Sequence, residues 1–130
     1  MCLIFVDKET KRTPGVGYKV VEKRDGKYIS WDYIPMAGKV EYKLNRWVDD
    51  PSEGKVTNNF DGLSYEKGFH IYLKKQRARP ILWILNSIRG QNRTLVQIKV
   101  KYKNVVASGD PDNPVVVARK IINKGEVEFL

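Results

Sequence analysis

The sequence predicts an α+β fold: a twisted antiparallel sheet or half-barrel with one principal helix over about residues 76–89. Apolar and polar residues alternate along residues 69–73 and again along residues 95–103, which is the pattern of half-buried strands. Between these stretches, apolar residues recur at three- and four-residue spacing, as on one face of a helix. These residues are Ala78, Ile81, Leu82, Leu85 and Ile88.

Both ends of the predicted helix carry residues that suit a helix end. Pro80 has no backbone N–H, but in the first turn of a helix that group has no intrahelical partner. Gly90 follows the last periodic residue and is typical of a helix C-terminus. Arg89 suits the negative end of the helix dipole. We therefore expect the helix to end at Gly90.

The first half of the chain contains the clearest turn signal. The short apolar run at residues 2–6 indicates a buried strand. Asp25-Gly26 lies between two β-prone runs and favours a type I′ hairpin, in which both central residues have positive φ. Residues 40–48 resume a strand-like pattern, whereas residues 49–62 are rich in turn formers and predict a long surface loop.

The last part of the chain predicts a turn, a buried strand and a second turn. Residues 108–114 form the first turn cluster, residues 115–122 are the strand, and residues 123–125 allow a turn into the C-terminal residues. We expect the core to combine this strand with the predicted helix and its neighbouring strands. The predicted core residues are Phe69, Ile71, Leu82, Leu85, Ile98, Val100, Val116 and Ile121.

The composition is that of a globular protein. The chain has 130 residues, of which 42% are hydrophobic and 30% charged, so we expect one domain over residues 1–130. No apolar run approaches the ~18 residues of a membrane-spanning helix. A single cysteine excludes an intrachain disulfide and suits a reducing cytoplasm, where we expect the protein to act.

Positive charge is concentrated in the second half of the chain. Residues 1–60 carry eleven cations and nine anions, whereas residues 61–130 carry thirteen and six. Residues 67–103 contain ten cations and no acid. Within them Lys99, Lys101 and Lys103 alternate with apolar residues, which predicts a lysine ladder on the solvent side of one strand.

We expect these cations to form a basic face that binds an acidic partner, either nucleic acid or an acidic protein surface. The alternative is a solvated face that only keeps the protein soluble. The predicted face consists of Lys74, Lys75, Arg77, Arg79, Arg89, Arg93, Lys99, Lys101 and Lys103.

Motifs of catalysis or metal binding are weak in this sequence. His70 is the one histidine, so no second histidine can share a metal with it, and a structural role is the expected one. Asp110 and Asp112 suggest a calcium loop, but the glycine and late glutamate of that motif are missing. No glycine-rich phosphate loop occurs. We therefore expect a binding protein with no catalytic residue, metal or cofactor.

Three short blocks resemble a group of small proteins from tailed phages and prophages. They are Met1-Cys2-Leu3, Gly68-Phe69-His70, and Val115-Val116-Val117-Ala118 with Lys120-Ile121 and Gly125-Glu126-Val127. This resemblance implies a phage-encoded accessory protein in the bacterial cytoplasm. Such a protein would inhibit a host or defence component, as anti-CRISPR proteins do, or would be a minor virion component.

Residues 68–107 also resemble the mono-ADP-ribosyltransferases, in which a Gly-aromatic strand leads into an alanine-bearing helix and then a strand. This resemblance implies a nucleotide site at His70 and Tyr72. The family's first-strand His or Arg has no counterpart in this chain, and its catalytic glutamate corresponds to either Glu126 or Glu128. The second function that we consider is therefore a nucleotide binder or enzyme of this type.

Overall fold

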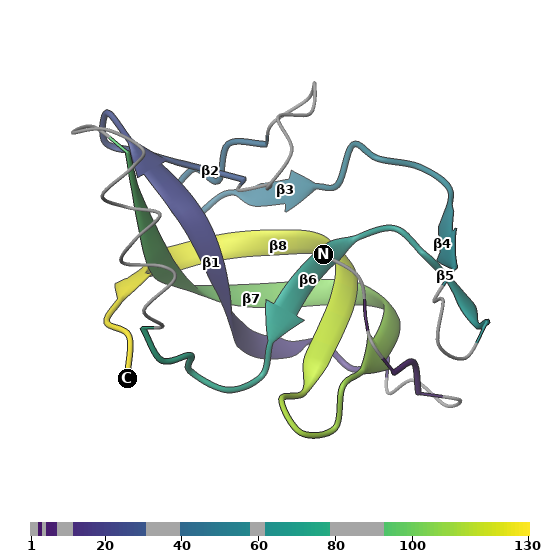
Figure 1. Cartoon of the computed structure of the whole chain (residues 1–130). Coiled ribbons are helices and arrows are strands. Elements are labelled where there is room, and N and C mark those ends of the chain that lie inside the picture. The colour runs from purple at the N-terminus through teal and green to yellow at the C-terminus, as the bar shows by residue number, and fades with distance from the viewer. Residues whose placement is uncertain (1–2, 4, 8–11, 31–39, 58–61, 79–92) are drawn as a thin grey trace.

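The protein is a twisted, strand-rich structure in a computed structural model that describes residues 3, 5–7, 12–30, 40–57, 62–78 and 93–130 (Figure 1). Strands β7 and β8 are much longer than the others and form the centre of the fold. The strands are β1 (Gly15–Arg24), β2 (Lys27–Ile29), β3 (Trp47–Asp49), β4 (Lys55–Thr57), β5 (Ser64–Glu66), β6 (Phe69–Tyr72), β7 (Arg93–Gly109) and β8 (Val115–Val127).

Four strands pair in a closed circuit, which makes the main sheet a small barrel. β1 pairs with β7, β7 with β8 and β8 with β6, all antiparallel. β6 then returns to β1 through the pair Tyr18 and Tyr72. β2 extends the sheet beyond β1, and β3 extends it beyond β8. Because the circuit is closed, its long strands have a pairing partner on both sides and leave no open sheet edge.

The close approach of β1 and β6 depends on Gly17. A Cβ atom at this position would lie 2.5 Å from Cγ2 of Ile71 and 2.6 Å from the backbone oxygen of Tyr72. Because real Cβ atoms do not approach a backbone oxygen so closely, only glycine fits there without a shift of one strand. Gly17 therefore permits the contact that closes the barrel.

β7 and β8 each form part of both halves of the barrel because they bend at two irregularities in their pairing. The register between them shifts between Ile98 and Val100 and again between Val105 and Ala107. The first shift lies opposite Gly125, whose φ is 116°, and the second lies close to Asn104, whose φ is 58°. Such bulges bend a strand and increase its twist. The predicted turn at residues 123–125 is wrong, since β8 continues through it.

Apolar side chains fill the barrel interior and a second cluster outside it. Six of the predicted core residues are buried, which confirms them: Phe69, Ile71, Ile98, Val100, Val116 and Ile121. Leu82 and Leu85 lie outside the described residues. The second cluster contains Leu3, Tyr65, Ala107, Val115 and Val117. It covers the outer side of β6 and of the adjoining ends of β7 and β8.

The predicted hairpin at Asp25-Gly26 is confirmed. β1 and β2 pair with Arg24 opposite Lys27, and the two residues between them have φ values of 50° and 77°. The predicted turn at residues 108–114 is also present between β7 and β8. The long loop predicted over residues 49–62 is only partly correct, because β4 lies within it and pairs with β5.

The predicted α+β class is wrong: the part of the chain that the structure describes contains strands and no helix. The predicted helix start at residues 76–78 has no regular structure, and residues 79–92, including Gly90, lie outside the description. A physical reason for the irregular start is visible at Gln76, where tertiary hydrogen bonds use both backbone groups. Its N–H donates to the side-chain oxygen of Gln97 at 2.7 Å. Its carbonyl accepts a hydrogen bond from the Leu130 N–H at 3.0 Å.

Candidate nucleic-acid interface

Strands β1, β7, β8 and β3 pair in this order and therefore share an outer face. One row across these strands is Val16, Lys101, Ile122 and Trp47, each residue in register with the next. Residues directly opposite each other in a sheet point to the same side. Val16 is 44% exposed and Trp47 is 47% exposed, whereas Val100, the neighbour of Lys101, is fully buried. The row therefore lies on the outside of the barrel.

Lysines from two neighbouring strands gather around this row. Lys99 and Lys103 are two residues to either side of Lys101 on β7, so all three share the outer face at steps of roughly 6–7 Å. Lys120 on β8 is in register with Lys103 and joins them. We call these four lysines, together with Trp47, the outer basic face.

The predicted lysine ladder is confirmed for Lys99 and Lys101, which are exposed, and Lys103 is half-buried. The Nζ atom of Lys103 lies 4.1 Å from the centre of the Trp47 ring, which is within cation–π range. The Nζ atom of Lys120 lies 3.2 Å from Oδ1 of Asp49, whose side chain is 71% exposed. Lys99 and Lys101 form no ion pair with any described residue. Two of the four lysines are thus available to an anionic partner.

Gln97 departs from the ladder pattern. It lies on the same side of β7 as Lys99, where alternation predicts an exposed residue, but it is fully buried. Its side-chain oxygen accepts a hydrogen bond from the Gln76 backbone N–H at 2.7 Å, and its amide nitrogen donates one to the Glu128 carbonyl at 3.0 Å. The loop after β6 and the C-terminal residues therefore cover this end of the face.

The hydrogen bond between Gln76 and Gln97 also places the cations of the loop after β6 near the lysine ladder. Lys75 and Arg77 flank Gln76, whose backbone is bound two residues from Lys99 along one side of β7. Lys74 and Arg77 are exposed, and Lys75 is half-buried. Of the other predicted cations, the backbone of Arg93 begins β7. Arg79 and Arg89 lie outside the described residues.

Trp47 and Lys120 belong to the outer basic face and were missed by the sequence prediction. Trp47 reaches the face through the pairing of β3 with β8, which joins residues more than seventy positions apart. No local pattern indicates such a pairing. Strand alternation could have indicated Lys120. Lys120, Ile122 and Lys124 alternate with Ile121 and Asn123, which are buried. Lys124 is exposed, and its Nζ atom lies 3.0 Å from Oδ1 of Asn45.

His70 packs against Tyr65 of the second apolar cluster and does not belong to the outer basic face. Its Nε2 atom is 3.4 Å from the hydroxyl oxygen of Tyr65, which accepts a hydrogen bond from the Leu3 N–H at 2.9 Å. Burial, followed by the positive charge of Lys19, lowers the pKa of His70 from 6.5 to about 3. The neutral ring therefore serves as a buried hydrogen-bonding group, which is its expected structural role.

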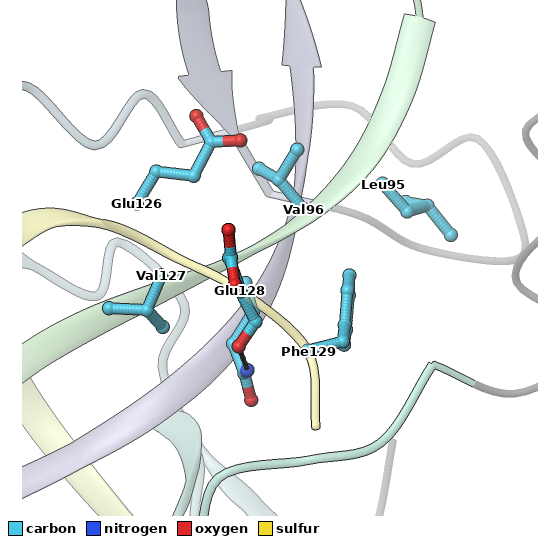
Figure 2. A pocket seen from close by; sticks show the side chains of 7 residues that line it. Leu95, Val96, Glu126, Val127, Glu128 and Phe129 are labelled. Carbon is cyan, nitrogen blue, oxygen red and sulfur yellow. Dashed lines mark hydrogen bonds between the residues drawn. The ribbon is translucent and has the colours of Figure 1, made fainter.

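Two shallow hollows occur in the described part of the surface. The larger, of about 490 Å³, is lined by Leu95, Val96, Gln97, Glu126, Val127, Glu128 and Phe129 (Figure 2). The smaller, of about 390 Å³, is lined by Asp7, Thr13, Pro14, Leu73, Tyr102, Ser108, Gly109, Pro114, Val115 and Val116. Neither lining includes His70 or Tyr72.

The nucleotide site implied by the ADP-ribosyltransferase resemblance therefore does not come together in these hollows. Glu126 and Glu128 line one of them, whereas His70 packs with Tyr65 elsewhere. The carboxylate of Glu126 is 3.0 Å from Nζ of Lys23 and 3.1 Å from the hydroxyl of Tyr28, so it already has two partners.

Comparison with known proteins finds no match: no family model, no curated protein and no solved structure is similar to this chain. Within the residues that the structure describes, there is no helix of the length and apolar character needed to cross a membrane.

Proposed function

We propose that the protein binds nucleic acid through the outer basic face. The observation that carries this proposal is that four lysines from two neighbouring strands share one surface with an exposed tryptophan. Lysine ammonium groups bind phosphates as point charges, and aromatic rings next to them are typical of surfaces that bind nucleic acid. The net charge of +9 favours association with any polyanion.

The arrangement of charges on this face favours an anionic partner. Lys99, Lys101 and Lys103 stand on one strand at steps of roughly 6–7 Å and repel one another. Asp49 offsets part of the charge at Lys120, but Lys99 and Lys101 form no ion pair with any described residue. A phosphate backbone would relieve this repulsion and release its own counterions, which is the main source of such binding.

The resemblance to phage proteins supports a biological setting for this activity. A small basic binder encoded by a phage would act as an accessory factor against a host or defence component, and a nucleic acid or nucleoprotein complex is a suitable target for the outer basic face. The proposed role is inhibition by binding, without a chemical step.

A salt titration tests the proposal. We expect the protein to bind labelled oligonucleotides at low salt, with log affinity falling linearly as log salt concentration rises. Replacing Lys99, Lys101 and Lys103 together by Gln should reduce the magnitude of that slope by roughly 2–3, because each lost phosphate contact removes about 0.7–0.9. Fluorescence anisotropy at several salt concentrations measures both quantities.

The matched control replaces Lys27, Lys55 and Lys67 by Gln. These exposed lysines lie on β2, on β4 and between β5 and β6, and not on the strands β7 and β8 that carry the lysines of the outer basic face; their loss changes the net charge by the same amount. The control should keep most of the affinity and of the salt slope. If the wild-type protein binds no oligonucleotide at low salt, nucleic acid is not a direct partner and an acidic protein surface takes its place. If both triple variants lose affinity equally, binding depends only on total charge.

A further inference from the structure

Trp47 is unusual on this surface because it is large, apolar and half exposed. It lies on β3, a strand of three residues at one side of the main sheet, and 47% of its surface is accessible. A single exposed apolar residue needs no explanation by itself. Trp47, however, lies in register with Ile122 and in contact with Lys103, so its ring is next to a lysine of the outer basic face.

The contact with Lys103 holds the indole ring and places a cation beside it. The ammonium group lies 4.1 Å from the ring centre, well within the roughly 6 Å range of a cation–π interaction. Pairing of β3 with β8 fixes the backbone of Trp47 over all three residues of the strand. A ring already held in place loses less conformational entropy when a ligand binds to it.

We infer that Trp47 stacks on a nucleobase, and that the outer basic face therefore prefers single-stranded over double-stranded nucleic acid. This inference rests on the proposed function and specifies its ligand. Lysines alone recognise phosphates in either form. The faces of the bases are accessible only in a single strand, because a duplex encloses them in its own stack. The ammonium group of Lys103 lies over one face of the ring, so the base would stack on the opposite face, and Lys103 would contact a neighbouring phosphate.

The test compares a labelled single-stranded oligonucleotide with a duplex of the same sequence. In fluorescence anisotropy at low salt, wild-type protein should bind the single strand more tightly. Trp47→Ala should weaken single-strand binding by about 5- to 150-fold, as expected for the loss of one base-stacking contact. It should weaken duplex binding much less, because the lysines and not the ring contact the duplex. Trp47→Phe, which keeps an aromatic ring, should retain most of the single-strand affinity.

Three further results separate this inference from the proposed function. If wild-type protein binds neither oligonucleotide, the proposed function fails. If it binds both equally and Trp47→Ala changes neither, the function stands and the stacking role is wrong. If Trp47→Ala weakens duplex binding as much as single-strand binding, the stacking role is also wrong. Trp47→Ile suits a strand but lacks a ring, and it carries the same test if the alanine variant does not fold.

Discussion

Replacing Ile98 by alanine is expected to lower the free energy of unfolding by about 2–5 kcal/mol. Ile98 is fully buried in the barrel interior, where it belongs to the largest apolar cluster. It lies on β7 between its register partners Lys19 of β1 and Glu126 of β8. Removing its side chain leaves a cavity between strands that are joined in a closed circuit and cannot easily move together. Urea unfolding at neutral pH measures the change.

Leu44→Ala is the matched control for this prediction. Leu44 is also a large aliphatic residue next to the barrel, but it is 55% exposed. Its loss should change the free energy of unfolding by less than about 0.5 kcal/mol. A loss of similar size in both variants, or one below about 0.5 kcal/mol for Ile98→Ala, would show that the barrel interior is wrongly assigned.

Acidification below pH 6.5 is expected to destabilise the protein through His70. The pKa of this histidine is lowered by burial, from 6.5 in the unfolded chain to about 3 in the folded protein. Between these values the unfolded chain binds a proton that the folded protein does not. The contribution of the neutral His70 to the free energy of unfolding is therefore complete above pH 6.5. It is lost as the pH falls towards 3, by up to about 1.4 kcal/mol per pH unit.

Urea unfolding at several pH values between 7.5 and 4.5 tests this expectation, with His70→Gln as the reference. Glutamine keeps a polar side chain next to Tyr65 but does not titrate. Carboxylates contribute to acid sensitivity in both proteins, so the difference between them reports His70. The wild-type protein should lose more stability than the variant over this range. Equal pH dependence in the two proteins would contradict the assigned environment of His70.

β6, the first half of β7 and the hairpin were predictable because their signals are local. Alternation along residues 69–73 and 95–103 identified β6 and the first half of β7, and Asp25-Gly26 identified a turn that needs positive φ. Gln97 shows the limit of the same pattern. Alternation placed it correctly on the outer side of β7, but only tertiary contacts with Gln76 and Glu128 bury it.

The closure of the barrel could not be predicted, because it depends on contacts between distant residues. Gly17 has no local feature that distinguishes it from a turn glycine, yet it allows β1 to approach β6. The bulge at Gly125 could not be predicted either, because a glycine after Asn-Lys indicates a turn equally well. At Gln76 the periodicity predicted a helix start, but the backbone N–H is bound to Gln97 and the carbonyl to the Leu130 N–H, both distant in sequence.

For the candidate site, the sequence predicted the ladder but not its surroundings. Lys99, Lys101 and Lys103 follow from strand periodicity alone. Lys120 and Trp47 join them only because β8 pairs with β7 on one side and with β3 on the other. A surface built across strands in this way has no motif within any single segment.

The most direct test of the proposed interface is a nuclear magnetic resonance titration of isotope-labelled protein with a single-stranded oligonucleotide. It reports the position of binding residue by residue in the intact protein. We expect the largest shift changes at the indole N–H of Trp47 and at the backbone amides of Lys99, Lys101 and Lys120. Changes centred on the hollow at Glu126 and Glu128, or no changes at low salt, would contradict nucleic-acid binding by the outer basic face.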